Sequence, residues 1–204
     1  MFKIFKLFGR GNDNGVTTRN GYLDTRGYYL AMEKKRSVGA NNHSAPHLPY
    51  AITDIINQCL SKENTLFVRW DIYSYRWGLH TFKHTSSSRI KLKKTDNNHR
   101  HFVRDGEKSL EELQNYCEEH RSKFDLVIFD GPDKRTEVEL IKPMLKAASV
   151  VVLVDDFSDE YDFEQTVEAF KADGFKALVI TNPAPLAHSM KGAIIYRNDN
   201  ILGI

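Results

Sequence analysis

The chain has 204 residues, which is enough for one domain with a sizeable core and short for two. Its content of 41% hydrophobic and 27% charged residues is ordinary for a globular protein, and the formal net charge of +2 gives no electrostatic case for nucleic-acid binding. The two cysteines, Cys59 and Cys117, form neither a disulfide framework nor a zinc motif, which suits a reducing cytoplasm. No apolar run approaches the roughly 20 residues needed to span a bilayer.

The N-terminal part carries the weakest structural pattern. Residues 1–10 alternate large apolar and basic side chains, so they either touch an anionic membrane surface weakly or form a chain end that frays or docks on the core. Residues 9–20 and 37–49 are polar and contain glycine, asparagine or proline, which is typical of loops. We therefore predict an irregular N-terminal extension over residues 1–48.

The middle of the chain predicts alternating helices and strands. Residues 49–60 form a helix, because proline stands in its first turn and isoleucines recur on one face. Strands follow over residues 65–72 and 89–96, the second with a basic exposed face. A capping box of Ser109 and Glu112 begins the next helix.

The second half predicts a parallel sheet. The continuous apolar runs 124–132 and 149–158 are typical of strands buried on both faces. Between them lies a crossover helix that Pro143 kinks or ends. A helix at 159–172, stopped by Gly174, and strands at 175–182 and 192–198 complete the chain. The fold class is α/β, a doubly wound, mostly parallel, Rossmann-like sheet over residues 49–204 with a C-terminal antiparallel strand pair.

Acidic residues follow several of these strands. In open parallel sheets the ligand lies beyond the carboxyl ends of the strands. Asp130, Asp155 and Asp156 could converge there on a hard divalent cation such as Mg²⁺. Alternatively, Asp155 or Asp156 caps the next helix. Asp130 precedes Gly-Pro, and no helix begins immediately after it, so we predict a role for Asp130 in the cleft.

The pattern around these acids carries a family resemblance. FDLVIFDGPDKR, VVVLVDDFS and the terminal GAIIYRNDNILGI together resemble the C-terminal half of a class I S-adenosylmethionine-dependent methyltransferase. Within that superfamily the chain is most similar to small bacterial FkbM-like and polysaccharide-associated methyltransferases. GYLDTRGYYL and PHLPYAITDIINQCL match their N-terminal segments, so the resemblance covers the chain from about Gly21 onward.

The resemblance implies a function and a set of site residues. It implies methyl transfer from S-adenosylmethionine to a hydroxyl group of a small molecule or glycan, with Mg²⁺ as a further candidate cofactor. Asp130 would sit at the reacting centre and Arg135 would steady an anionic substrate. Asp155 and Asp156 would hold the metal or orient the acceptor. The catalytic candidates are thus Asp130, Arg135 and Asp156.

The cofactor loop of the family is altered in TLFVRWDIYSYRWG, residues 65–78. Aligning Ser74 with the serine of the family's Gly-Ser-Gly-x-Ser turn puts Trp70 and Ile72 at the glycine positions. The aromatic side chains either line an adenosine pocket or fill it. A catalytically inactive methyltransferase-like binding or scaffold protein is therefore the alternative function. The residues proposed to bind the cofactor are Tyr73, Ser74, Asp96, Asp105 and Asp130.

Histidines offer acid–base groups near the same edge of the sheet. His43, His47 and His188 stand in loops that cover the strand ends in this fold, so each is a candidate general base. Residues 80–104 form a basic band that either meets an anionic ligand or is a solvated face.

Overall fold

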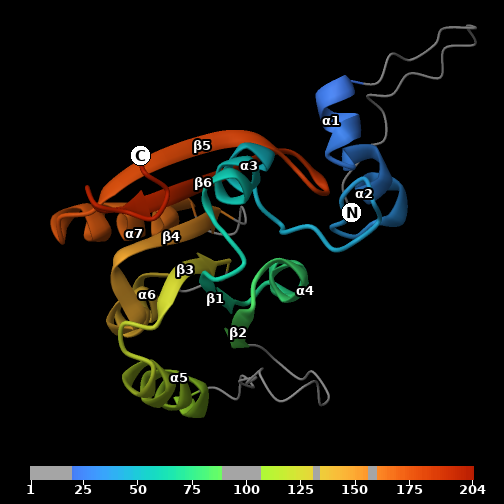
Figure 1. The fold of residues 1–204 in the computed structure, drawn as a ribbon. Coiled ribbons are helices and arrows are strands. Elements are labelled where there is room, and N and C mark those ends of the chain that lie inside the picture. Colours follow the sequence, from blue (N-terminus) through green and yellow to red (C-terminus); the bar gives the residue numbers. More distant parts are fainter. Residues whose placement is uncertain (1–19, 89–106, 131–133, 156–159) are drawn as a thin grey trace, which may run out of the picture.

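The computed structural model describes residues 20–88, 107–130, 134–155 and 160–204 (Figure 1). Its six described strands form one sheet in the order β2-β1-β3-β4-β6-β5. The first four are parallel, and β6 is antiparallel to both β4 and β5. The strands are β1 (Thr65–Arg69), β2 (His84–Ser88), β3 (Phe124–Phe129), β4 (Leu145–Asp155), β5 (Lys176–Ala184) and β6 (Ala187–Tyr196). The predicted α/β class, parallel sheet and antiparallel C-terminal pair are confirmed.

Helices cover both faces of this sheet. The helices are α1 (Gly21–Thr25), α2 (Tyr28–Lys34), α3 (Tyr50–Cys59), α4 (Ile72–Thr81), α5 (Glu107–Glu119), α6 (Lys134–Ile141) and α7 (Glu160–Ala172). One core cluster joins α3 and α4 to the sheet, and the other joins α5, α6 and α7 to it. The chain is thus a three-layer sandwich of helices, sheet and helices.

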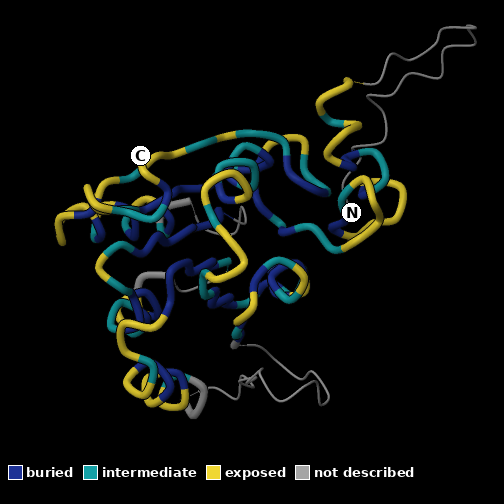
Figure 2. Tube along the Cα trace, viewed as in Figure 1, coloured by how far each residue is buried: buried dark blue, intermediate teal, exposed yellow. Residues whose placement is uncertain are grey.

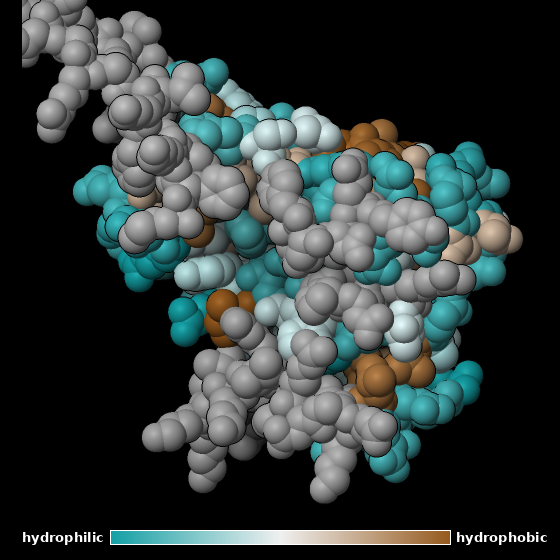
Figure 3. Space-filling view, turned by 180° about the vertical axis from the view of Figure 1, so that it is seen from behind, coloured by the Kyte–Doolittle hydropathy of each residue, from teal (hydrophilic) through white to brown (hydrophobic). Residues whose placement is uncertain are grey.

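The alternation of side chains along the strands divides the core into these two clusters. In β1, Phe67 packs on the α5–α7 side, while Leu66 and Val68 pack on the α3–α4 side. Strands β1 and β3 and most of β4 are dark in Figure 2, whereas the edge strand β5 is mostly intermediate or exposed. On the face in Figure 3, coloured atoms are mainly hydrophilic and apolar ones gather in small patches.

The β3–β4 connection confirms the predicted role of Pro143. Helix α6 ends at Ile141, and Pro143 lies in a 3₁₀ turn over Lys142–Met144. Strand β4 then begins at Leu145, so residues 145–148 are strand and not the predicted end of the crossover helix. A proline ring removes a helical hydrogen bond, which explains why α6 ends before Pro143 and the chain tightens into a 3₁₀ turn.

Other element boundaries also differ from prediction. Helix α5 begins at Glu107, so Ser109 lies inside its first turn and is not the N-cap. Strand β6 begins at Ala187 and not at 192, because a tight turn at Leu186 (φ 69°) lets pairing continue to Ala184–Ala187. Helix α7 and Gly174 (φ +80°) after it match the predicted helix and its stop.

The extension over residues 1–48 is less irregular than predicted, since it contains α1 and α2. The Asn20 side chain accepts hydrogen bonds from Tyr22 N–H and Leu23 N–H and so begins α1. Residues 1–10 and the predicted strand at 89–96 lie outside the described residues. No helix in the described ranges combines the length and apolar character needed to cross a bilayer.

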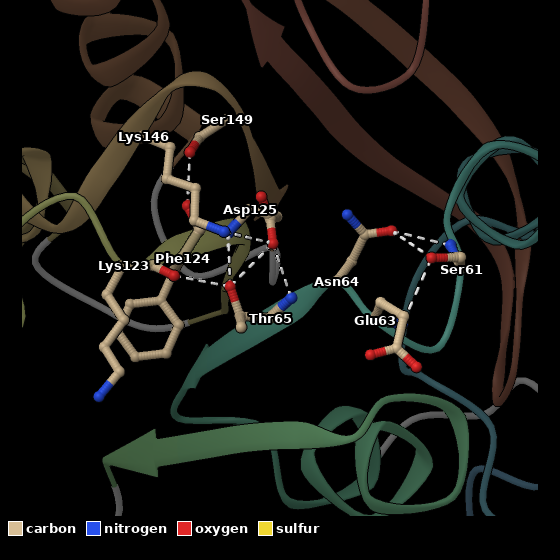
Figure 4. A network of polar contacts seen from close by, with 9 residues as sticks. All are labelled: Ser61, Glu63, Asn64, Thr65, Lys123, Phe124, Asp125, Lys146 and Ser149. Carbon is tan, nitrogen blue, oxygen red and sulfur yellow. Dashed lines mark hydrogen bonds and ion pairs between the residues drawn. The ribbon is translucent and has the colours of Figure 1, made fainter.

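A polar network fixes the amino ends of the central strands (Figure 4). Asp125 Oδ2 accepts hydrogen bonds from Thr65 N–H at 2.8 Å, Thr65 Oγ1 at 2.9 Å and Lys146 Nζ at 2.8 Å. These contacts join β1, β3 and β4. Burial raises the pKa of Asp125, but Lys146 and Thr65 outweigh burial, so its pKa lies below the ordinary value.

Asp125→Asn should reduce the free energy of unfolding by about 1–2 kcal/mol at neutral pH, because charged hydrogen bonds are lost. A carboxyl group whose pKa is lower in the folded protein than in the unfolded chain stabilises the folded protein at pH values above its unfolded-state pKa. This stabilisation is lost as the pH falls through the folded-state pKa. The difference between variant and wild type should therefore shrink on acidification, measured by urea unfolding across pH. Glu63→Gln, at an exposed ion pair with Lys83, is the matched control and should change stability little. A pH-independent loss in Asp125→Asn would contradict the electrostatic cause.

Candidate functional site

The candidate site lies at the carboxyl ends of β1 and β3. Asp130 N–H donates a hydrogen bond to the Arg69 carbonyl at 3.2 Å, which holds the two strand ends side by side. The loop before α3 brings His47 to this edge. His47 N–H donates to Asp71 Oδ2 at 3.3 Å, and its Nδ1 lies 3.8 Å from Asp130 Oδ2. An imidazole and two carboxylates thus meet where parallel sheets bind ligands.

The electrostatic surroundings of His47 favour its charged form. Burial lowers its pKa, but Asp130, Asp71 and the Pro185 backbone together raise the pKa above the usual histidine value. The 3.8 Å separation is an ion-pair distance and too long for a hydrogen bond. His47 keeps 30% of its side chain exposed, so its ring can reach a ligand at the edge.

The turn between β1 and α4 differs most from the sequence prediction. Strand β1 ends at Arg69 and α4 begins at Ile72, so the predicted strand over residues 65–72 is wrong in its last three residues. The Asp71 side chain accepts hydrogen bonds from Tyr73 N–H and Ser74 N–H, both at 2.8 Å. This N-cap starts a helix directly after the strand, and it outweighs the β-favouring aromatic residues of the run.

Trp70 has a backbone conformation that glycine adopts more readily than any other residue. Its φ of 75° lies in the left-handed region, which costs a non-glycine residue on the order of 1 kcal/mol or more. Two contacts offset this strain: the indole N–H donates to Glu137 Oε2 at 2.8 Å, and the Arg69 guanidinium lies 4.3 Å from the ring centroid. The ring also packs against the α5–α7 core, so it is held on the side of the sheet away from α3.

A buried ion pair lies beneath this turn. Arg69 and Glu137 are 2% and 4% exposed, and Arg69 Nε donates to Glu137 Oε2 at 2.8 Å. A second contact joins Arg69 Nη2 to Glu137 Oε1. Glu137 therefore joins α6 to the end of β1 and fixes the Trp70 ring at the same time.

Among the other predicted cofactor-binding and catalytic residues, the structure describes the side chains of Tyr73 and Ser74. Tyr73 and Ser74 lie in the first turn of α4, where Ser74 is fully buried and its Oγ has no hydrogen-bond partner among the described residues. Arg135 lies in α6, and its side chain is outside the described part of the structure. Asp96, Asp105 and Asp156 also lie outside the described ranges.

Two of the three predicted metal ligands, Asp130 and Asp155, lie in the described part of the chain, at the ends of neighbouring strands. Asp155 ends β4 opposite Lys191 of β6, and Lys191 Nζ lies 5.1 Å from the Phe163 ring centroid on the α7 side. Asp130 instead faces His47. Among the described residues no group of three His, Cys, Asp or Glu side chains is placed to hold a metal ion. Because Asp156 is not described, the set Asp130, Asp155 and Asp156 stays a prediction.

No family model and no curated protein matches this sequence. Solved structures do match. The chain superposes on a putative SAM-dependent methyltransferase from Streptococcus mutans with a TM-score of 0.55 and 14% identity, covering 72% of this chain and 48% of that one. The chain has the methyltransferase fold. It spans about half the length of that protein.

Two further structures share the methyltransferase fold. A putative methyltransferase from Streptococcus mutans in complex with SAH matches at TM-score 0.50 and 13% identity, over 73% of this chain and 97% of that one. The MycE methyltransferase from the mycinamycin biosynthetic pathway, in complex with Mg and SAH, matches at TM-score 0.50 and 14% identity, over 72% and 46%. At these identities the likeness establishes the fold alone.

Sequence reasoning named His47 without distinguishing it from other histidines, and it missed Arg69, Glu137 and the role of Asp71. His47 was one of three equivalent loop histidines, and only the fold places it beside Asp130. Arg69 and Glu137 are 68 positions apart, and a charge inside an apolar strand gives no sign of its partner. Asp71 could have been recognised as an N-cap, because an acid that precedes a helical turn is a sequence signal.

Proposed function

We propose that this chain is a divergent methyltransferase that transfers a methyl group from S-adenosylmethionine to a hydroxyl group of a small molecule or glycan. The observation that carries the proposal is the meeting of His47 with Asp130 at the carboxyl edge of a methyltransferase-type sheet, 3.8 Å apart. O-methylation releases the hydroxyl proton, so a base at this edge is the group that the reaction needs.

The described residues fit the cofactor through their charge. Asp71 and Asp130 follow the ends of β1 and β3, and Asp155 is the last residue of β4. Their carboxylates suit the positive charge of a sulfonium. The Trp70 ring is held on the α6 side by Glu137, away from His47. Asp130 is the residue that we expect to lie nearest the charged centre of the cofactor.

This arrangement suggests a role for each residue in the proposed reaction. The sulfonium of S-adenosylmethionine supplies an already activated methyl group. His47 accepts the proton that the acceptor hydroxyl loses, and Asp130 orients the imidazole and stabilises its charged form. Asp71 fixes the His47 backbone through the N–H group. Holding the acceptor oxygen in line with the methyl group supplies most of the remaining rate enhancement.

A specific observation favours a second function, a methyltransferase-fold binding protein that does not take the cofactor. The N–H groups at the start of α4 would ordinarily be available to an anionic group, but Asp71 already accepts from two of them. Trp70 also places a side chain where the family has glycine. Both features alter the part of the cleft that the methionine end of the cofactor would use.

Thermal unfolding with and without S-adenosylhomocysteine tests the proposed function. A ligand at a hundred times its dissociation constant stabilises the folded state by about 2.7 kcal/mol, so the melting temperature should rise by several degrees. Asp125→Asn, which alters the opposite edge of the sheet, should retain this rise. No rise at millimolar S-adenosylhomocysteine would exclude the enzyme and support the binding protein. Repeating the experiment with Mg²⁺ or EDTA tests the predicted metal.

A further inference from the structure

A cavity lies away from the carboxyl edge, between α3, α4 and the loop over residues 39–46. Its volume is about 530 Å³, within the range of small-molecule sites. Tyr50 and Trp77 contribute aromatic surface from the two helices. His43 and His80 also line the cavity, with ring centroids 6.0 Å apart. None of these residues takes part in the proposed methyl transfer.

The charges in the cavity wall are balanced. Arg26 Nη2 contacts Asp54 Oδ2 at 2.8 Å, and the Tyr22 hydroxyl donates to the same oxygen at 3.1 Å. The two charged side chains of the wall thus neutralise each other. The wall also carries hydroxyl and amide groups, from Thr25, Asn41, Ser44, Thr53, Asn57 and Thr81. Thr25, Thr53 and Thr81 already donate their hydroxyl protons to backbone carbonyls, so these oxygens can only accept from a ligand, whereas amide groups can both donate and accept. Such a mixture suits a neutral ligand with several hydroxyls.

The Tyr50 hydroxyl group at this wall lacks a hydrogen-bond partner among the described residues. The residue is 3% exposed, and its hydroxyl is buried with no partner among the described residues. Leaving a buried hydroxyl unpaired is costly, so such a group in a folded protein calls for an explanation. The hydroxyl is closed off in this conformation, so a ligand would complete its hydrogen bonding after a small movement of the cavity wall.

We propose that this cavity binds a neutral sugar, with the Tyr50 hydroxyl as its buried hydrogen-bonding anchor. A sugar combines a compact size, no net charge and hydroxyls that match donors and acceptors alike. This site is independent of the cofactor and would remain if the chain bound no S-adenosylmethionine.

The two tryptophans give a direct test, because Trp77 lines the cavity and Trp70 lies at the carboxyl edge. The two indole N–H signals in a nitrogen–proton correlation spectrum are assigned with Trp70→Phe. Glucose, galactose and N-acetylglucosamine are then titrated into the high millimolar range. At least one sugar should move the Trp77 signal and leave the Trp70 signal in place. S-adenosylhomocysteine should move the Trp70 signal instead, so failure of either proposal is seen separately.

Variants locate the bound sugar. Tyr50→Phe should weaken sugar binding by about tenfold through loss of one hydrogen bond, while the melting temperature without ligand stays at or above that of wild type. Asn57→Trp should block the cavity, whereas Gln58→Trp, at the exposed neighbour that does not line it, should bind normally. A lower melting temperature in Tyr50→Phe would mean that the hydroxyl has a structural partner and would overturn the anchor. Movement of Trp77 by inorganic phosphate and by no sugar, or no movement at all, would overturn the proposal.

Discussion

Replacing Glu137 by leucine should lower the free energy of unfolding by about 3–5 kcal/mol, because the change leaves the Arg69 guanidinium buried without its partner. Arg69 is 2% exposed, so it cannot reach water by a simple rotamer change. The Trp70 indole loses its acceptor in the same variant. Urea unfolding followed by circular dichroism measures the loss.

The double variant Arg69→Met with Glu137→Leu is the matched control. It removes both charges and keeps apolar volume, so its stability should lie much closer to wild type than that of Glu137→Leu. Equal losses in the single and double variants would show that packing around Glu137, and not the unpaired charge, causes the effect.

Replacing His47 by glutamine should lower the rate of methyl transfer by 10²- to 10⁴-fold, the usual range for loss of a general base. Circular dichroism and thermal unfolding should show a folded protein. The rate is measured with labelled S-adenosylmethionine and a panel of small-molecule and glycan acceptors. A variant as active as wild type would exclude His47 as the base.

The pH dependence separates the base from a residue that only positions it. His47 must be neutral to accept a proton, so the wild-type rate should rise with pH through the raised pKa of His47. Asp130→Asn removes a carboxylate that raises this pKa, so the rise should move to lower pH while the maximal rate falls. An unchanged pH profile in Asp130→Asn would contradict the proposed coupling of the two residues.

The sequence predicts those parts of the fold that depend on local patterns. Apolar runs locate β3 and β4, and Pro143 and Gly174 stand where the helices before them end. The secondary structure of the run containing Trp70 is harder to predict, because its aromatic residues favour a strand while Asp71 caps a helix. Only the tertiary contact with Glu137 explains why a tryptophan is accepted at positive φ.

The candidate site could be predicted only in part. Asp130 was predicted from the Gly-Pro that follows it, and the structure puts it at the carboxyl edge as expected. Which of the loop histidines lies beside Asp130 depends on the path of the loop before α3. No spacing in the sequence predicts that path. The pairing of Asp155 with Lys191 likewise appears only once the register of β4 and β6 is known.

The hydrogen bond between Tyr28 and His188 joins residues 160 positions apart, at 2.5 Å. It connects α2 to the β5–β6 hairpin, whose Pro185 backbone lies beside His47. Contacts between residues so far apart in the sequence tend to form late in folding, because the entropy cost of closing a large loop comes before the stabilisation that the contact provides. The surroundings of His47 therefore depend on docking between α2 and the β5–β6 hairpin, so a change in the contact between Tyr28 and His188 should be felt at the carboxyl edge.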